Sequence, residues 1–153
     1  MTELSATPLA RLFAMAARTL VDDLHHRLRD RGWQDVRASF GFVLLAARAA
    51  PITAVDLAEL MGVTKQAASK LAASMVEAGY LLQGVDERDS RQRPFRLSAL
   101  GVRLLADVEA IYREVEEGWA EVIGERSLQR LRRDLTAAVK AAHGGELPPV
   151  RPL

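Results

Sequence analysis

The spacing of apolar residues along the chain predicts a mainly helical protein. Over about twenty residues near the start they recur every three or four positions, which places them on one face of a helix that Gly32 ends. A second helix, 36–50, is apolar on most sides, as expected of a buried element, and Pro51 stops it. The stripe of the first helix consists of Leu9, Leu12, Phe13, Ala16, Leu20, Val21, Leu24 and Leu28.

Two short helices follow, separated by a turn that contains Gly62. Thr53 and Asp56 have the spacing of a capping box at the start of the first helix. Thr64 is suited to cap the second, whose apolar positions leave a face of polar and small residues on the other side. Two short helices joined by such a turn are typical of a helix-turn-helix. The polar face comprises Lys65, Gln66, Ser69, Lys70 and Ala73.

Two short strands are predicted after Gly79, a glycine placed to end the second of these helices. Residues 80–85 have the composition of a strand, and in the next strand Phe95 and Leu97 alternate with Arg96. The turn between the strands is rich in charged side chains. A charged hairpin directly after a helix-turn-helix is the arrangement of a winged helix, which contacts two grooves of one DNA duplex.

Ser98 is positioned to cap a long helix with an apolar seam of about three heptads. The seam could be core within the chain or an interface shared with a second chain. We prefer the interface, because the flanking helices offer more apolar surface than a small lobe can bury. Ser127 is predicted to start a last helix, and 144–153, with two glycines and three prolines, is expected to be loose. The seam consists of Leu100, Leu104, Val108, Ile111, Val115, Trp119 and Val122.

Composition narrows the class of protein. The 153 residues suit one domain, and an apolar share of 49% is enough for a core. The absence of cysteine excludes disulfides, thiolate zinc sites and thiol redox sensing. His25 and His26 are adjacent and cannot form the i, i+4 pair of zinc helices, so we expect no metal and no cofactor. No stretch is apolar enough to span a membrane, and we expect a cytoplasmic protein.

Charge is distributed unevenly, although the net charge is only +1. Residues 107–125 hold seven carboxylates and one base, whereas residues 64–96 hold six bases and four acids. One face of the molecule could therefore approach phosphates and another could not.

The sequence carries none of the usual signs of an enzyme. There is no Gly-rich phosphate loop, no cysteine nucleophile and no histidine in a known arrangement with Ser and Asp. The acidic run is spread around a helix instead of converging on one point. We therefore expect no enzyme, and the class to weigh against DNA binding is a winged-helix adaptor that binds proteins.

The polar face of the second helix-turn-helix helix is the first candidate site. It could enter the major groove, with Gln66 on an adenine edge, a lysine on guanine, and Ser69 or Thr64 on a base or phosphate. The alternative is an ordinary solvated face. Small residues favour DNA, because they let a helix approach the duplex closely. The candidate DNA-binding residues are Thr64, Lys65, Gln66, Ser69 and Lys70.

The charged turn is the second candidate site. We expect Arg91 and Arg93 to reach the adjacent minor groove or its phosphates, and Asp86 and Asp89 to brace the hairpin by ion pairs. For Arg88 the sequence allows two roles, a contact with DNA or a part in the ion-pair brace. The alternative is an exposed turn whose ion pairs contribute only about 0–1 kcal/mol each.

These motifs resemble the MarR family of bacterial transcription regulators. The resemblance covers about the whole chain and is sharpest over 52–101, in LAELMGVTKQAASKLAASMVEAGYL and DERDSRQRPFRLSALG. Two departures are modest: Glu87 stands where proline is common, and Ser90 where a second arginine is common. The residues that match the family's wing pattern are Asp86, Arg88, Asp89, Arg91, Arg96, Ser98 and Gly101.

The resemblance implies a winged helix-turn-helix fold, mainly α, flanked by long N- and C-terminal dimerisation helices. We expect one domain, 1–143, with a DNA-binding lobe at 52–98 and dimerisation helices at 8–31 and 99–143.

The resemblance also implies a homodimer that binds a pseudo-palindromic operator in double-stranded DNA. Such a regulator usually represses, and a small aromatic or phenolic effector relieves it. The family's ligand pocket forms around the second helix, so Trp33 and Phe40 are candidate pocket residues, with ordinary core packing as the alternative. The alternatives to the function as a whole are a protein-binding adaptor and a constitutive activator without a small-molecule response.

Overall fold

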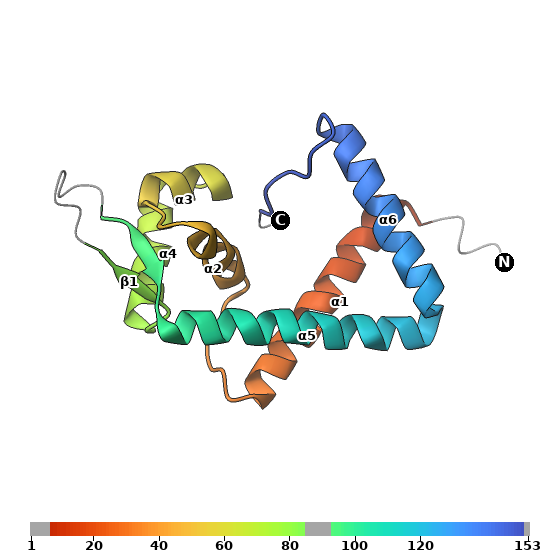
Figure 1. The fold of residues 1–153 in the computed structure, drawn as a ribbon, viewed down its shortest axis with the longest axis horizontal. Coiled ribbons are helices and arrows are strands. Elements are labelled where there is room, and N and C mark those ends of the chain that lie inside the picture. The colour runs from red at the N-terminus through yellow and green to blue at the C-terminus, as the bar shows by residue number, and fades with distance from the viewer. Residues whose placement is uncertain (1–6, 85–92, 152–153) are drawn as a thin grey trace.

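The computed structural model describes residues 7–84 and 93–151 (Figure 1). Their order of elements is the one that the sequence predicts, and it confirms the mainly helical winged helix-turn-helix fold. None of the helices in these two ranges is long and apolar enough to cross a membrane. The elements are α1 (Leu9–Asp30), α2 (Ala38–Ala49), α3 (Ala54–Met61), α4 (Lys65–Glu77), β1 (Leu81–Gln83), β2 (Phe95–Leu97), α5 (Ala99–Ile123) and α6 (Glu125–Ala142).

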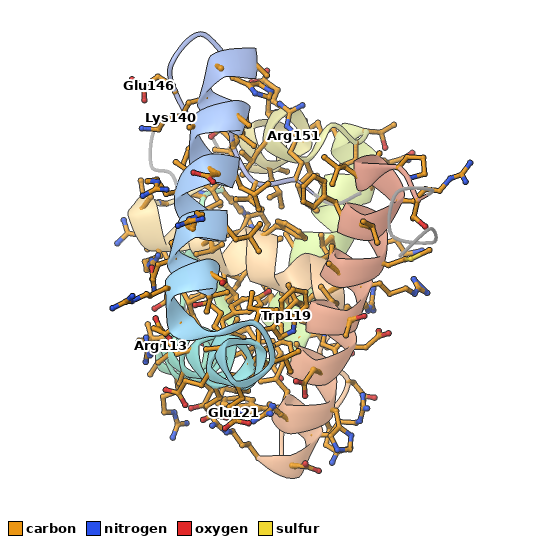
Figure 2. The ribbon with its side chains drawn as sticks, turned by 90° about the vertical axis from the view of Figure 1, so that its right-hand side faces the viewer. Arg113, Trp119, Glu121, Lys140, Glu146 and Arg151 are labelled. Carbon is orange, nitrogen blue, oxygen red and sulfur yellow. The ribbon has the colours of Figure 1, made fainter. Side chains whose placement is uncertain are left out.

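The long helix α5 is the axis of the molecule (Figure 1). A lobe made of α2, α3, α4 and the two strands sits at its start, α1 crosses it, and α6 returns from its far end at an angle. Figure 2 looks toward that far end, with α1 and α6 on either side of α5. The lobe is thus held at one end of a helical frame that leaves α6 standing away from it.

The last helix begins two residues earlier than the sequence prediction at Ser127. Gly124 occupies the N-cap position with φ 86°, a conformation that glycine adopts without strain, and α6 starts at Glu125. The Gly124 carbonyl then accepts the first helical hydrogen bond, from the amide of Leu128 at 3.0 Å. Positive φ at this glycine is what turns the chain between α5 and α6, so no side-chain cap is needed.

The apolar seam of α5 is mostly core within the chain, which corrects the interpretation as an interface shared with a second chain. Leu104, Val108, Ile111 and Val115 are buried, because α1 and α2 both pack on this side of α5. Of the seam residues, only the last, Val122, is largely exposed, at 84%. The apolar surface available to a second chain therefore lies elsewhere.

A tight joint connects the lobe to α5. Ser98 caps α5 by accepting a hydrogen bond from the Gly101 amide at 3.0 Å, and its hydroxyl donates to the carbonyl oxygen of Gly79. Gly79 ends the turn after α4 with φ 87°. The next residue, Tyr80, is buried and has the rings of Trp33 and Phe40 near it, with centroids 6.1 and 5.9 Å away. The end of α4 is thereby fixed to the start of α5.

The acidic run along α5 is largely used inside the chain. Glu114 forms ion pairs with Arg27, at 3.2 Å, and with Arg31, both from α1. The Asp23 hydrogen bond and the nearby Glu114 carboxylate raise the pKa of Arg27. Further along the run, Glu109 pairs with Arg48 of α2 and Glu116 pairs with Arg132 of α6 at 2.6 Å. These carboxylates therefore connect α5 to three neighbouring helices, which the sequence analysis did not anticipate.

Candidate nucleic-acid interface

The helix-turn-helix is defined at both of its helix starts by side-chain caps. Thr53 and Asp56 form the expected capping box: the Thr53 hydroxyl accepts from the Asp56 amide at 3.2 Å, and the carboxylate accepts from the Thr53 amide at 3.3 Å. Gly62 ends α3 with φ 67°, a left-handed conformation that glycine adopts readily. The Thr64 hydroxyl then accepts from the Ala67 amide at 3.1 Å and starts α4. The direction of α4 is thus set within three residues of α3.

Helix α4 presents the polar face that the sequence predicts. Its opposite side is fully buried in the lobe through Ala68, Ala72 and Met75. Of the five candidate residues at its start, Ser69 is half-buried, and the other four are exposed on the outer side: Thr64, Lys65, Gln66 and Lys70. The exposed residues include two cations and one amide, and α4 carries no acidic side chain in its first turn.

The two strands form the base of the wing. They are antiparallel, with Leu82 opposite Arg96, and the amide of Gly84 donates to the Pro94 carbonyl at 2.8 Å. Ile52, before α3, pairs with Phe95 and ties this base to the helix-turn-helix. Arg93 is exposed where the described part of the wing resumes. The other predicted wing residues lie outside the described residues. They are Asp86, Arg88, Asp89 and Arg91.

Arg96 is a candidate that the sequence analysis did not include among the DNA-binding residues. It is exposed on the outer face of β2, whereas Phe95 on the other face is buried. The alternation of Phe95, Arg96 and Leu97 in the sequence indicates that Arg96 faces outward, because neighbouring residues of a strand point to opposite faces. Arg96 and Arg93 together give the base of the wing two outward cations.

A model of the MarR family matches residues 41–92, a segment that contains α3, α4 and β1. Over this segment, about a third of its length, the chain is similar to the MarR family. No curated protein matches it.

Three solved structures share the fold of this chain. A mutant of MarR from E. coli is 21% identical, with a TM-score of 0.73 over 87% of this chain and 97% of the other. A mutant of S. aureus MepR bound to an oligodeoxyribonucleotide is 19% identical, with a TM-score of 0.62 over 89% and 99%. S. aureus MepR bound to ethidium bromide is also 19% identical, with a TM-score of 0.58 over 90% and 99%.

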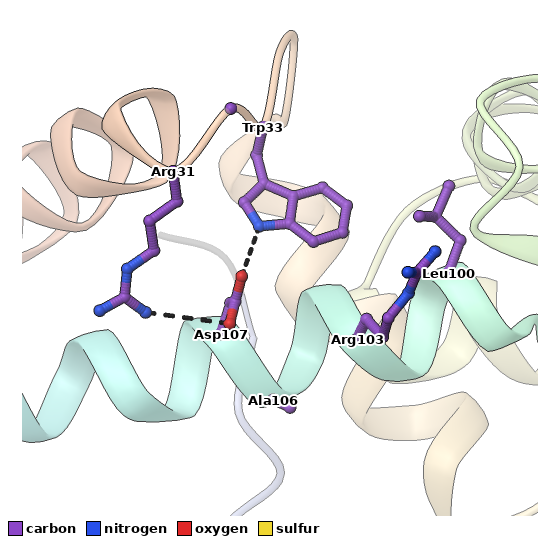
Figure 3. A pocket seen from close by; sticks show the side chains of 7 residues that line it. Arg31, Trp33, Leu100, Arg103, Ala106 and Asp107 are labelled. Atoms are coloured by element: carbon purple, nitrogen blue, oxygen red, sulfur yellow. Dashed lines mark hydrogen bonds and ion pairs between the residues drawn. The ribbon is translucent and has the colours of Figure 1, made fainter.

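Trp33 lines a cavity of about 490 Å³ between the end of α1 and α5 (Figure 3). Its indole Nε1 donates to Asp107 at 2.7 Å, and Arg31 pairs with the same carboxylate at 3.9 Å. Arg103 lines the cavity from the next turn of α5. The cavity thus combines an aromatic ring with two guanidinium groups and one carboxylate.

The second predicted pocket residue is placed differently. Phe40 is buried in the core against Tyr80 and lines none of the cavities at Trp33 or between α2 and α5. Trp33 also lines a smaller cavity of about 150 Å³ together with His25. Burial lowers the pKa of His25, and the nearby Arg29 charge lowers it further. Of the two candidate pocket residues, Trp33 therefore lines both of these cavities and Phe40 lines neither.

Proposed function

We propose that the protein is a transcriptional regulator that binds double-stranded DNA as a homodimer, with α4 in the major groove and the wing beside it. The observation that carries the proposal is the exposed polar face of α4, fixed by the Thr64 cap and by burial of its other side. Arg93 and Arg96 of the wing add positive charge beside the helix-turn-helix. The similar structure of an S. aureus MepR mutant is a complex with an oligodeoxyribonucleotide, which supports the same role here.

The residues of α4 suit different parts of a duplex. Gln66 can form two hydrogen bonds with an adenine edge, and Lys65 or Lys70 can bind guanine or phosphate. The Thr64 oxygen is already used to cap α4, so its hydroxyl hydrogen is left to donate to a phosphate oxygen. Half-buried Ser69 adds little bulk, which lets α4 approach the groove closely.

The wing is proposed to contribute phosphate or minor-groove contacts through Arg91 and Arg93. Asp86 and Asp89 brace the hairpin in this proposal, and Arg88 either joins the brace or contacts DNA. Arg93 is supported by its exposure at the base of the wing. Phosphate contacts of this kind position a protein on DNA and make its affinity salt-dependent, whereas base contacts give sequence preference.

The proposed dimer uses apolar side chains at the end of the molecule away from the lobe. In the first half of α1, Leu9 is 67% exposed and Phe13 is 43% exposed, and α6 buries only Leu128. A large apolar surface of this kind marks an interface. A twofold dimer also places two copies of α4 on one duplex, as two half-sites of a pseudo-palindromic operator require. The exposed apolar residues in this region are Leu9, Leu12, Phe13, Met15, Val122, Ile123, Leu131 and Val139.

We further propose that the regulator is a repressor relieved by a small aromatic or phenolic effector. Of the two candidate pocket residues, Trp33 is the better supported, because it lines a cavity where the end of α1 meets α5. An effector there would contact the joint between the lobe and the helical frame. The structure of S. aureus MepR with ethidium bromide shows an aromatic molecule bound to a protein of this fold.

The experiment that tests DNA binding is fluorescence anisotropy with duplex DNA from upstream of the protein's own gene, repeated across a salt series. Lys70→Ala should weaken binding, and its slope of log affinity against log salt should fall by about one. Lys140→Ala, which removes an exposed lysine from α6, is the charge-matched control and should bind as the unmodified protein does. If the Lys70 variant has the same affinity and salt slope as the Lys140 variant and the unmodified protein, the alternative function, a winged-helix adaptor that binds proteins, is favoured instead.

A further inference from the structure

The chain turns back toward the lobe after α6 instead of continuing away from it (Figure 1). Gly144 and Gly145 have φ of 66° and 97°, conformations that other residues rarely adopt. The Gly145 amide donates to the carbonyl oxygen of Lys140 at 2.8 Å, which closes the last turn of the helix. Two glycines at this point therefore direct the following residues across the space between α6 and the lobe.

Val150 of this returning segment lies at a groove between α2 and α5. The groove has a volume of about 350 Å³ and is lined mainly by apolar side chains. Tyr112 lines it from α5, and burial raises the pKa of the Tyr112 hydroxyl. Val150 is itself 64% exposed, so it lines the groove without being buried in it. The large aliphatic and phenylalanine side chains that line the groove together with Val150 are Phe42, Leu45, Leu105 and Val108.

Arg151, the next residue, contacts the helix-turn-helix. Its guanidinium donates to the carbonyl oxygen of Glu59, in the last turn of α3, at 3.4 Å. Arg151 is labelled in Figure 2, where it overlaps the lobe, and its hydrogen bond to α3 joins residues 92 positions apart. The last turn of α3 contains no basic residue of its own. A cation is favoured there because the final carbonyls of a helix carry partial negative charge.

We propose that Pro148–Arg151 is a strap that docks in cis over the α2–α5 groove and closes it to compact apolar molecules. Pro148 and Pro149 restrict the backbone before Val150, which lowers the entropy lost when the strap docks. The strap joins the end of α6 to α3, so a molecule that displaces Val150 also separates Arg151 from the helix-turn-helix. This regulation of the groove goes beyond DNA binding and does not depend on it.

The position of the strap can be tested with a spin label, since the chain has no cysteine of its own. A nitroxide attached to Val150→Cys should broaden the amide signals of 41–45 in α2 and of 108–112 in α5. A second sample mixes isotope-labelled unmodified chains with spin-labelled chains that carry no isotope. Broadening in the first sample alone supports docking in cis. No broadening at the groove, or broadening in the mixed sample, overturns the proposal.

Closure of the groove is tested with an uncharged fluorescent dye, N-phenylnaphthylamine, on the full chain. If the strap leaves the groove open in about one molecule in five, its removal should raise dye affinity about fivefold. A chain that ends at Glu146 and the variant Val150→Asp should both show this increase. Leu147→Asp is the matched control, because Leu147 is similarly exposed, at 55%, and does not line the groove. Unchanged affinity in both strap variants, or an equal increase in the control, overturns closure by the strap.

Discussion

Gly101 packs so closely on Tyr80 that a Cβ at position 101 would lie 2.2 Å from the Tyr80 carbonyl oxygen. That oxygen also accepts the amide of Ser98 at 3.1 Å, so it is held in place. The contact joins the first turn of α5 to the residue that follows α4. Gly101 is therefore needed for the joint that positions the candidate DNA-binding helix on the helical frame.

Gly101→Ala should destabilise the fold by about 2 kcal/mol or more, because backbone atoms must move to admit the methyl group. Gly118→Ala is the control on the same helix. Gly118 has open space around its Cβ position, so alanine there should stabilise the protein by about 0.5–1 kcal/mol through helix propensity. Urea unfolding measures both values. Two variants with equal stability would contradict the assigned packing at Gly101.

The sequence predicted the fold well where local chemistry determines it. Thr53, Thr64 and Ser98 were identified as helix caps from residue type and spacing, and each accepts the expected backbone amide. The exposed face of α4 also followed from its periodicity. These features depend on residues within four positions of one another, which a sequence displays directly.

Features that depend on distant residues were predicted less well. The seam on α5 satisfied a heptad pattern, but a pattern does not say which chain covers it, and α1 and α2 of the same chain do. The ion pairs of Glu114 with Arg27 and Arg31 join residues more than 80 positions apart. The sequence left Phe40 open between pocket lining and core packing, because its burial against Tyr80 depends on how that helix is rotated in the lobe.

Arg91 and Arg93 should contribute to DNA affinity without regard to sequence. We expect Arg91→Ala and Arg93→Ala each to weaken binding to specific and unrelated duplexes alike, and to reduce the salt slope by about one per lost phosphate contact. Arg130→Ala, an exposed arginine of α6, provides the matched control. Anisotropy titrations at several salt concentrations measure these effects. Affinity and slope that stay constant in both wing variants would exclude the wing contact.

Gln66 should instead affect sequence preference. If its amide binds an adenine edge, Gln66→Ala should lose about 1–3 kcal/mol of discrimination at one base pair of each half-site and little affinity for unrelated DNA. Binding to a library of operators substituted one base pair at a time identifies the position. An operator profile identical to that of the unmodified protein would place Gln66 outside base recognition.

The proposed dimer interface predicts a change in oligomeric state from one substitution. Phe13→Asp places a charge within the exposed apolar half of α1, and burying an unpaired charge is costly, so the variant should be a monomer at micromolar concentration. Val102→Asp is the control, since Val102 is also exposed but lies at the lobe end of α5. Sizing with light scattering gives the masses. A monomeric unmodified protein, or a dimeric Phe13 variant, would contradict this interface.

Trp33 should report effector binding. Trp33 and Trp119 are the two tryptophans of the chain, so Trp119→Phe leaves Trp33 as the single fluorophore beside Asp107 and Arg103. Titration with salicylate, a phenolic acid, should change its fluorescence saturably, because the carboxylate can bind guanidinium while the ring packs on indole. Arg103→Ala in this background should weaken binding about tenfold, or ~1.4 kcal/mol. The variant Trp33→Phe is the reciprocal test, because Trp119 is then the only fluorophore. If the fluorescence changes saturably in this variant and not in Trp119→Phe, the effector binds elsewhere and Trp33 is a packing residue.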